Sequence, residues 1–477
     1  MASIVNSNNA DIPLAVDLDG TLIRSDLLVE SLVVLLKTKP LLALLVPFWL
    51  FRGKAWVKSQ IARHTRLSPR RLPVNPQFRL FLDSQKGRKI FLATASNEKF
   101  AADIARFFGF DGYFASTESV NLTGETKRRK LVEEFGEHGY DYAGDSEKDL
   151  PVWQSAREAI LVNSERQLER HLANSIRFKA VFDTSTPSLM RYLSAMRVYQ
   201  WLKNLLIFVP LLVAHKFDDS HAIFETVMAF FAFSLCASSV YVLNDLFDLP
   251  DDRLHPNKRN RPIASGDLPI KHALFMIPIL LLASVTIAAM LPWKLVVVLG
   301  VYYLLTLVYS LYLKSVTILD VQILATFYTL RLIAGAAVLE VTPSFWLLAF
   351  SMSLFLSLAL AKRYTGLQVR MKAGQKPASR RGYQLSDMPI LQSFGIASGY
   401  ISVLILALYI NSNDVSHLYD HAIALWLLCP AVLYWIGRLW VYVHRGRMHD
   451  DPLIFALTDR ISLLIGAIMI AIMYIAI

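Results

Sequence analysis

The chain has 477 residues, more than a single compact domain usually holds, so we expect two or more units. Hydrophobic residues make up 54% of it, which exceeds the usual share in soluble proteins and indicates an integral membrane protein. The net charge of +11 does not indicate nucleic-acid binding, because no basic stripe with interleaved aromatic residues is present. The excess suits cytoplasmic loops and anionic headgroups or substrates.

The first 175 residues have the pattern of a soluble α/β domain, with short apolar strands between charged helical stretches. Strands are expected at Ile12–Val16, Lys89–Ala93 and Tyr140–Ala143, each followed by polar or glycine-containing turns. Residues 176–195 are expected to link this domain to the second half of the chain.

Polar residues with catalytic chemistry follow these strands. Asp17 and Asp19 stand two residues apart at the end of the first strand, where two carboxylates can divide nucleophile and acid/base roles around one Mg²⁺. Thr94 ends the second strand with a hydroxyl donor suited to a phosphoryl oxygen. Lys127 can neutralise charge on the nucleophile and the phosphate.

Two further carboxylates, Asp145 and Asp149, follow the third strand and are candidate metal ligands. Taken in order, these elements resemble the haloacid dehalogenase (HAD) superfamily, in its phosphoserine-phosphatase-like branch, over about residues 12–165. The resemblance implies a Rossmann-like phosphatase domain. Residues 27–80 fall where that branch inserts the helical cap that selects the substrate.

The same resemblance implies the role of each residue. Asp17 would be the nucleophile that forms an aspartyl-phosphate, and Asp19 would be the general acid/base. Thr94 and Lys127 would bind phosphate. Asp145, together with Asp17 and the backbone of Asp19, would hold Mg²⁺.

One apolar run in the expected cap, Pro40–Phe51, is too short to span a membrane and contains two prolines. We expect it to be a buried helix of the cap. The alternative is an interfacial segment that docks the domain onto the bilayer.

The residues from 196 to 477 are expected to form an all-α, multi-pass membrane domain. About nine stretches approach spanning length, near 198–214, 222–244, 272–290, 294–312, 316–339, 344–361, 389–411, 421–441 and 460–477. Alternate loops carry most of the lysine and arginine, so the positive-inside rule places them on the cytoplasmic side of a bacterial-type inner membrane. The α/β domain is then cytoplasmic, and the C-terminus is on the opposite side.

An aspartate run lies at the end of the second of these stretches, on the cytoplasmic side. Asp245, Asp248 and Asp252 are spaced i, i+3 and i+7, so a helix would place all three on one face. Carboxylates this close repel one another unless a cation lies between them, and Mg²⁺ prefers such oxygen ligands and often bridges to phosphates. The run therefore indicates an Mg²⁺–diphosphate site; the alternative is a solvated acidic loop.

With Asn244, the run makes the NDxxDxxxD motif of the UbiA superfamily of intramembrane prenyltransferases, and the loop up to Gly266 also resembles that family. The second DxxxD of its aromatic prenyltransferases is absent, because Leu324 stands four residues after Asp320. The segment Met196–Asn204 and the pattern YSxxLK…LD…R…AG instead resemble the decaprenyl-phosphate phosphoribosyltransferases, which transfer 5-phosphoribose from phosphoribosyl diphosphate (PRPP) to a polyprenyl phosphate.

Basic residues support that second branch, because a sugar donor with two phosphorylated positions and a lipid phosphate acceptor need several cationic partners. Arg331 is costly within a membrane helix unless it meets an anion, although a structural pair with Asp320 on the same helix is an alternative. Some of the other candidates would be ordinary cytoplasmic charges. The expected substrate-binding set is Asn244, Arg197, Lys203, Lys258, Arg259, Arg261, Lys314, Asp320, Arg331, Lys362 and Arg363.

The sequence thus predicts a Mg²⁺-dependent phosphoribosyltransferase in the bilayer, with PRPP and polyprenyl phosphate as substrates, fused to a phosphatase that removes the 5-phosphate of the product. Two alternatives remain. One is an aromatic prenyltransferase that uses a polyprenyl diphosphate donor, with a phosphatase of separate substrate. The other is a transporter or lipid-handling scaffold with a regulatory HAD domain.

Overall fold

The computed structural model describes residues 11–85, 87–163, 170–172, 176–182, 188–255, 257–372, 382–412, 419–448 and 451–476. The chain forms two compact units, each built from segments distant in sequence. The first unit comprises Met1–Met196 and Tyr241–Ile277, and the second comprises Arg197–Val240 and Pro278–Ile477.

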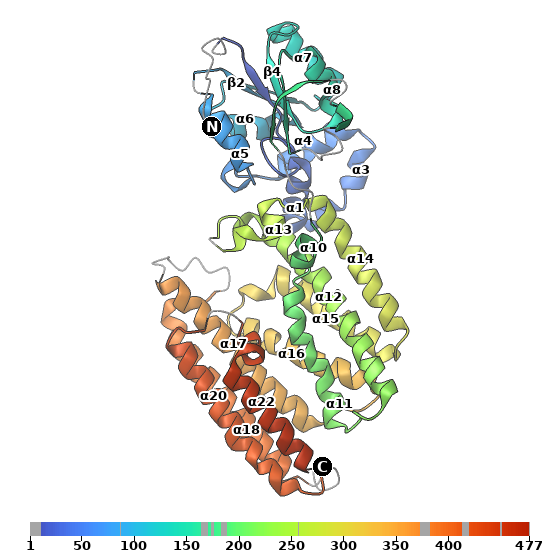
Figure 1. Cartoon of the computed structure of the whole chain (residues 1–477), viewed down its shortest axis with the longest axis vertical. Coiled ribbons are helices and arrows are strands. Elements are labelled where there is room, and N and C mark those ends of the chain that lie inside the picture. Colours follow the sequence, from blue (N-terminus) through green and yellow to red (C-terminus); the bar gives the residue numbers. More distant parts are fainter. Residues whose placement is uncertain are drawn as a thin grey trace. The chain divides into compact units, whose positions relative to one another are not determined.

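The first unit contains a six-stranded parallel sheet with strand order β3-β2-β1-β4-β5-β6 (Figure 1). Its strands are β1 (Leu14–Val16), β2 (Ile90–Asn97), β3 (Gly112–Ser116), β4 (Asp141–Gly144), β5 (Ala159–Val162) and β6 (Phe178–Phe182). In the register, Val16 lies opposite both Leu92 and Ala143, so the carboxyl ends of the three central strands meet at one edge. That edge is where parallel sheets place their ligands.

Both faces of the sheet are buried, as continuous apolar strands require. Leu14 and Val16 pack with Phe78 and Phe100, which come from α5 (Pro76–Ser84) and α6 (Glu98–Phe108). On the opposite face, Ala15 packs with residues that include Leu131 and Trp153, from α7 (Glu125–Phe135) and α8 (Leu150–Ser155). The segment expected to be a linker contributes β6 and α10 (Leu189–Ala195), while residues 183–187 of it lie outside the described part.

The segment 27–80 is helical, as expected of a cap. It contains α1 (Leu27–Thr38), α2 (Pro40–Ala43), α3 (Val46–Leu50), α4 (Lys54–His64) and the start of α5. The expectation of one buried helix over Pro40–Phe51 is wrong, because the run forms two short helices and leaves large apolar side chains exposed. Leu41 is 81% exposed and Phe51 is 89% exposed. The two helices are too short to be buried on all sides. Pro40 and Pro47 lie at the helix starts, and a proline lacks the backbone N–H that would continue a preceding helix.

Parts of the membrane half also belong to the first unit. α12 (Ser220–Asp252) and α14 (Ile270–Ala289) each have residues in both units. Between them, the first unit contains the 3-10 turn η5 (Lys258–Asn260) and α13 (Pro262–Ser265). The end of α12 that carries the aspartate run is therefore part of the same compact unit as the sheet.

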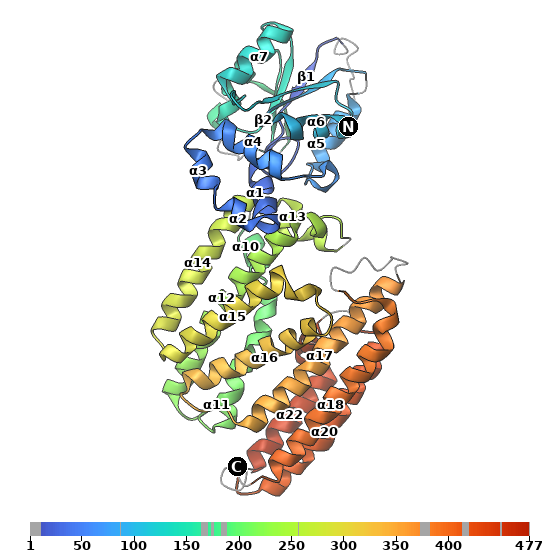
Figure 2. The ribbon, with the colours of Figure 1, turned by 180° about the vertical axis from the view of Figure 1, so that it is seen from behind.

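The second unit is helical (Figures 1 and 2). Its elements are the 3-10 helix η4 (Val198–Phe208), α11 (Val209–Val213), α15 (Trp293–Leu311), the turn η6 (Leu313–Ser315), α16 (Leu319–Val338), α17 (Phe345–Lys372), the turn η7 (Leu385–Asp387), α18 (Met388–Ile410), the 3-10 helix η8 (Ala422–Leu427), α20 (Leu428–His444), α21 (Pro452–Thr458) and α22 (Arg460–Ala476). Its core includes Tyr328, Phe355 and Trp440.

Among the described residues, seven helices of the chain are long and apolar enough to cross a membrane. There are up to nine if each of two bent pairs counts as one span. This number agrees with the expected multi-pass domain. Gly335 of α16 allows η4 to approach closely, since a Cβ there would lie 2.1 Å from the carbonyl oxygen of Ile207. The approach matters because η4 carries two of the polar residues of the membrane half, Lys203 and Asn204.

Candidate active sites

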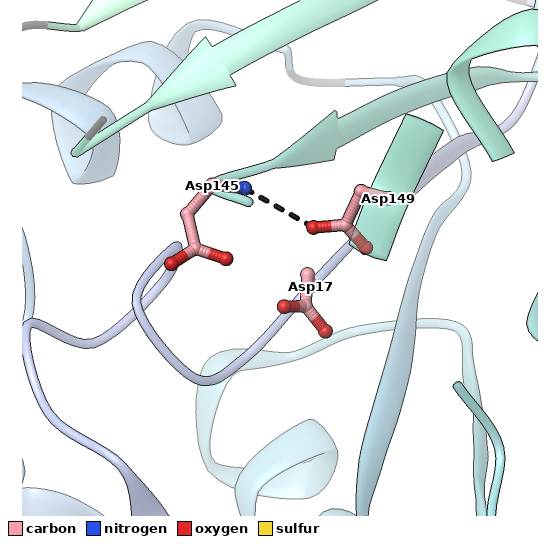
Figure 3. A group of neighbouring side chains, drawn as sticks. All are labelled: Asp17, Asp145 and Asp149. Atoms are coloured by element: carbon pink, nitrogen blue, oxygen red, sulfur yellow. Dashed lines mark hydrogen bonds between the residues drawn. The ribbon is translucent and has the colours of Figure 1, made fainter. Parts of the chain in front are cut away.

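Three carboxylates converge at the carboxyl edge of the sheet (Figure 3). Asp17 follows β1, Asp145 follows β4, and Asp149 ends the 3-10 turn η3 (Glu147–Asp149). Each offers one oxygen within 4.8 Å of the others. Residues far apart in sequence meet here because the central strands end level with one another.

Lys127 of α7 neutralises part of this charge. Its Nζ lies 2.9 Å from Asp17 Oδ1, 3.2 Å from Asp149 Oδ1 and 2.7 Å from the hydroxyl of Tyr142. Burial alone would lower the pKa of Lys127, but the neighbouring Asp149 and Asp17 carboxylates raise it above its usual value. Lys127 therefore remains charged.

One ammonium does not balance three carboxylates. Burial raises the pKa of Asp17 to about 7, with Lys127 opposing the shift, and burial followed by the charges of Asp17 and Asp149 raises the pKa of Asp145 well above its usual value. Such crowding is relieved by a cation with a preference for oxygen ligands. The residues therefore fit Mg²⁺. Asp149 is also hydrogen-bonded by Tyr142 and the backbone N–H of Asp145, so Asp17 and Asp145 have more capacity left as ligands.

Asp19 is held on both oxygens beside this cluster. Its Oδ1 accepts from the backbone N–H of Leu27 at 2.7 Å, and its Oδ2 accepts from Ser96 Oγ at 2.8 Å. Burial and then the charge of Asp26 raise the pKa of Asp19 to about 6. A carboxyl with this pKa is suited to acid/base chemistry near neutral pH.

Thr94, a predicted phosphate ligand, is fully buried, and its hydroxyl accepts from the backbone N–H of Ser96 at 3.0 Å. Lys58 is a cavity residue that sequence reasoning missed. From the cap helix α4, its Nζ donates to the carbonyl of Ala95 and, at 2.9 Å, to Asn121 Oδ1. Nothing local marks this lysine among the many of the cap; only the fold brings it to the strand end.

The aspartate run forms the last turns of α12 rather than a solvated loop, so that alternative is wrong. Asp245 is 4% exposed and Asp252 is 2% exposed. Arg261 Nη1 contacts both, at 3.0 Å from Asp245 Oδ1 and in a short contact with Asp252 Oδ2. The two carboxylates therefore turn toward the same guanidinium. Asp248 lies 3.6 Å from the ammonium of Lys37 of α1, in the same unit.

Other predicted residues surround this run. Lys258 lies 3.7 Å from Asp252 Oδ1, Asn244 is half-buried, and Arg259 is exposed. Arg261 and Lys258, which were predicted to bind substrate, thus contact the aspartates. Arg259 does not share their burial.

The second unit contains a separate set of ionic groups within its helices. Arg363 of α17 donates to both oxygens of Asp320, with Nη2 at 2.7 Å from Oδ1, and the hydroxyl of Tyr309 also donates to Oδ1 at 2.7 Å. Arg331 donates from Nε to Asn204 Oδ1 at 2.7 Å and to the carbonyl of Phe327. The alternative pairing of Arg331 with Asp320 is therefore wrong, because each has partners on other helices.

Asp451 was not predicted. Its Oδ2 contacts both Lys203, at 2.7 Å, and Lys362, while the hydroxyl of Tyr328 lies 3.3 Å from Oδ1. Its sequence signal is that of a helix cap, since it precedes Pro452 at the start of α21 and accepts from the backbone N–H of Leu453 at 3.2 Å. Two of the predicted anion-binding lysines thus share one buried carboxylate.

Arg197 precedes η4 with a left-handed backbone (φ 53°), and Lys314 is half-buried in η6. Apolar helices with buried ionic groups and an aspartate run at a helix end are typical of intramembrane enzymes, because such charges are costly in a membrane and are retained for function.

The chain belongs to the UbiA prenyltransferase family, whose model matches residues 205–470. It is thus a transferase enzyme. It is 36% identical to the uncharacterized protein y4nM of Sinorhizobium fredii, over 96% of this chain and 89% of that one. It is 31% identical to the decaprenyl-phosphate phosphoribosyltransferase of Mycolicibacterium smegmatis, over 56% of this chain and 86% of that one.

Solved structures are similar to each half. A UbiA homolog from Archaeoglobus fulgidus bound to DMAPP and Mg²⁺ covers 60% of this chain and 98% of its own, with 17% identity and a TM-score of 0.45. A HAD family hydrolase, t0658, from Salmonella enterica covers 33% of this chain and 64% of its own, with 16% identity and a TM-score of 0.26.

Proposed function

We propose that the membrane half transfers 5-phosphoribose from PRPP to a polyprenyl phosphate. We further propose that the phosphatase domain removes the 5-phosphate to give polyprenyl-phosphoryl-ribose, with both steps on the cytoplasmic side. The observation that carries the donor assignment is the engagement of both Asp320 oxygens by Arg363. This engagement argues against Asp320 as half of a second metal-binding carboxylate pair, and Leu324 stands where the other half would be.

The remaining cations of the second unit support an anion-rich pair of substrates. Lys203, Lys362 and Arg331 are ionisable groups in apolar helices, where charges are costly and are retained for function. Lys203 and Lys362 together carry more positive charge than their shared Asp451 balances, which suits phosphate binding. The 31% identity to a decaprenyl-phosphate phosphoribosyltransferase favours the same substrates.

In the transfer step, an oxygen of the polyprenyl phosphate attacks the anomeric carbon of PRPP. The bond from that carbon to the diphosphate breaks, diphosphate leaves, and a phosphodiester forms. Mg²⁺ held by Asp245, Asp248 and Asp252 would neutralise the leaving group. The acceptor is already anionic, so the step needs no strong general base.

In the hydrolysis step, the Asp17 carboxylate attacks the phosphorus of the 5-phosphate monoester, and the bond to the ribose oxygen breaks. Asp19 donates a proton to that oxygen. Water then cleaves the aspartyl-phosphate with Asp19 as the base, releasing inorganic phosphate and regenerating Asp17. Lys127, 2.9 Å from Asp17, neutralises charge on the nucleophile and the phosphoryl group.

A donor screen tests the proposal. Purified full-length protein in nanodiscs is given polyprenyl phosphate with PRPP, or an aromatic acceptor with a polyprenyl diphosphate, and the lipid product is analysed by mass spectrometry. We expect product, diphosphate and phosphate with PRPP. Turnover only with the prenyl diphosphate would contradict the donor assignment.

The phosphatase step is tested in the same assay. Asp17→Asn should release diphosphate at the normal rate but no phosphate, so the lipid product retains its 5-phosphate. Asp83→Asn, at a 50%-exposed side chain of α5, is the matched control and should release both. Unchanged phosphate release by Asp17→Asn would contradict the coupling.

A further inference from the structure

The cavity beside Asp17 is lined by two segments that are far apart in the sequence. It has a volume of about 1140 Å³. One part of its lining comes from the sheet and the cap, and another comes from Gly266, Asp267, Pro269, Ile270 and Lys271. This second segment follows the aspartate run, and it belongs to the same compact unit as the sheet. The phosphatase cavity is therefore completed by residues of the transferase half.

The segment 266–271 is anchored at both ends. Lys271 Nζ lies 2.8 Å from Asp26 Oδ2, and Asp267 Oδ1 lies 3.4 Å from Arg24 Nη1. Gly266 has a φ of +80°, and a Cβ there would lie 2.8 Å from Cβ of Arg24, so both the turn and the close approach require glycine.

A buried ion pair also joins the cap to the chain just before the segment 266–271. Arg253, just after α12, donates to both carboxylate oxygens of Glu30 of the cap at 2.6 and 2.9 Å. The Arg253 side chain is 7% exposed and that of Glu30 is 3% exposed. Arg253 also donates to the carbonyls of Arg71 and Ala264 at 3.0 Å. A bidentate pair with both charges buried and additionally hydrogen-bonded is a specific contact rather than a casual surface pairing.

The shape and chemistry of the cavity point to a substrate with a lipid end. Its volume exceeds the roughly 300–1,000 Å³ of ordinary small-ligand pockets. Asp17 and Lys127 lie at the catalytic end, whereas Pro269 and Ile270 give the wall an apolar part. Ile270 and Lys271 are also the first two residues of α14, which is long and apolar enough to span the membrane. A head group in the cavity would therefore be followed by a path along an apolar helix.

We propose that the segment Gly266–Lys271 is a substrate-binding wall of the phosphatase, which thereby selects a lipid-linked phosphate monoester over soluble ones. Lys271 contacts the polar linkage between the sugar and the lipid, where a phosphodiester is the matching anion. The lipid chain leaves along α14. This inference rests on the proposed phosphatase activity, and the identity of the sugar rests on the proposed transfer step as well.

Lys271 is suited to a selective test because its side chain is 61% exposed and that of Asp26 is 35% exposed. Ion pairs this exposed contribute little to stability. Lys271→Gln should therefore fold normally. Lys294→Gln is the matched control, because Lys294 is likewise the second residue of an apolar helix, α15, and is half-exposed in a pair with Glu340.

The experiment supplies two phosphate monoesters directly, so that it does not depend on the transferase step. These are polyprenyl-phosphoryl-5-phosphoribose, made separately with a known decaprenyl-phosphate phosphoribosyltransferase, and ribose 5-phosphate. The wild type should hydrolyse the lipid substrate with the higher kcat/KM. Lys271→Gln should lower kcat/KM for the lipid substrate at least tenfold, mainly through KM, with ribose 5-phosphate changed less than twofold. Lys271→Arg should recover most of the loss, and Lys294→Gln should match the wild type.

Three outcomes overturn the inference. Equal losses on both substrates would mean a structural role, and no loss on either would mean that Lys271 does not contact the substrate. A wild type that prefers ribose 5-phosphate would exclude a lipid-selective cavity. A different result would contradict the proposed phosphatase activity itself: equal hydrolysis of both monoesters by the wild type and by Asp17→Asn.

Discussion

Asp451→Asn tests the shared carboxylate of the second unit. The substitution keeps the shape of the side chain and removes its charge, so that Lys203 and Lys362 lose the negative charge that both contact. Removing one member of a buried ion pair costs about 3–5 kcal/mol. The Lys203 side chain is 8% exposed but that of Lys362 is 36% exposed, so we expect the lower end of that range. If this free energy is lost because the two lysines leave the positions in which they bind substrate, about 3 kcal/mol corresponds to roughly a hundredfold loss in kcat/KM.

The assay is PRPP-dependent release of diphosphate by the full-length protein in nanodiscs, with the unfolding temperature measured on the same samples. Asp459→Asn is the matched control, because Asp459 also begins a helix of the same bent pair and forms an ion pair, with Arg438 at 2.7 Å. It should keep activity within about threefold, an effect below 1 kcal/mol. The double variant Asp451→Asn/Lys362→Gln removes one of the two uncompensated charges and should regain part of the stability but not the activity. Normal turnover by Asp451→Asn, or recovery of activity in the double variant, would refute the positioning of the lysines.

Three further predictions address the first unit. Lys127→Met should lower phosphate release by roughly 10²–10³-fold, as loss of an electrostatic donor does, while diphosphate release is unchanged. Arg88→Met leaves the buried carboxylate of Asp141 with fewer partners and should destabilise the domain by about 3 kcal/mol at pH 7 in a thermal-unfolding experiment. Burial opposes the shift, but Arg157 and Arg88 lower the pKa of Asp141, so the stabilisation is present above the unfolded value of 3.8 and is lost as pH falls through the lower folded value. The difference in the free energy of unfolding between wild type and Arg88→Met should decrease below pH 4. A difference that does not change with pH would contradict this linkage. In a chain with Cys236 and Cys429 replaced, a polarity-sensitive dye attached at Phe51→Cys should report a lipid environment in nanodiscs. The same dye at Leu80→Cys, a position 71% exposed on α5, should report water. Equal spectra from the two positions would exclude an interfacial role for the apolar run Pro40–Phe51.

Several features of the sites were predictable because they depend on short-range geometry. A residue that follows a buried parallel strand lies at the carboxyl edge of the sheet, so Asp17 and Asp145 were expected to meet, and they do. Spacings of three and seven residues return a helix to the same face, so Asp245, Asp248 and Asp252 were expected to surround one cation. Arg261 contacts Asp245 and Asp252, whereas Asp248 lies beside Lys37.

Other features depend on which helices pack together, and no local pattern encodes that. Arg331 and Asp320 are eleven residues apart on one helix face, yet Arg331 bonds to Asn204 of η4 and Asp320 to Arg363 of α17. Asp451 has the sequence signature of a helix cap, and the two lysines that it holds lie far away in the chain.

The sequence by itself indicated a membrane transferase with an aspartate run, fused to an α/β domain for which it predicts phosphatase chemistry. The ends of strands, the spacing of residues along a helix and the lengths of apolar stretches are local properties, so they can be recognised in the sequence alone. Only the tertiary structure decided which residues share a site. It placed Lys58 at the strand end, paired Asp451 with two lysines, and added the start of α14 to the phosphatase cavity. These contacts join segments up to about half the chain apart, and they exist because burial of apolar surface brings those segments together.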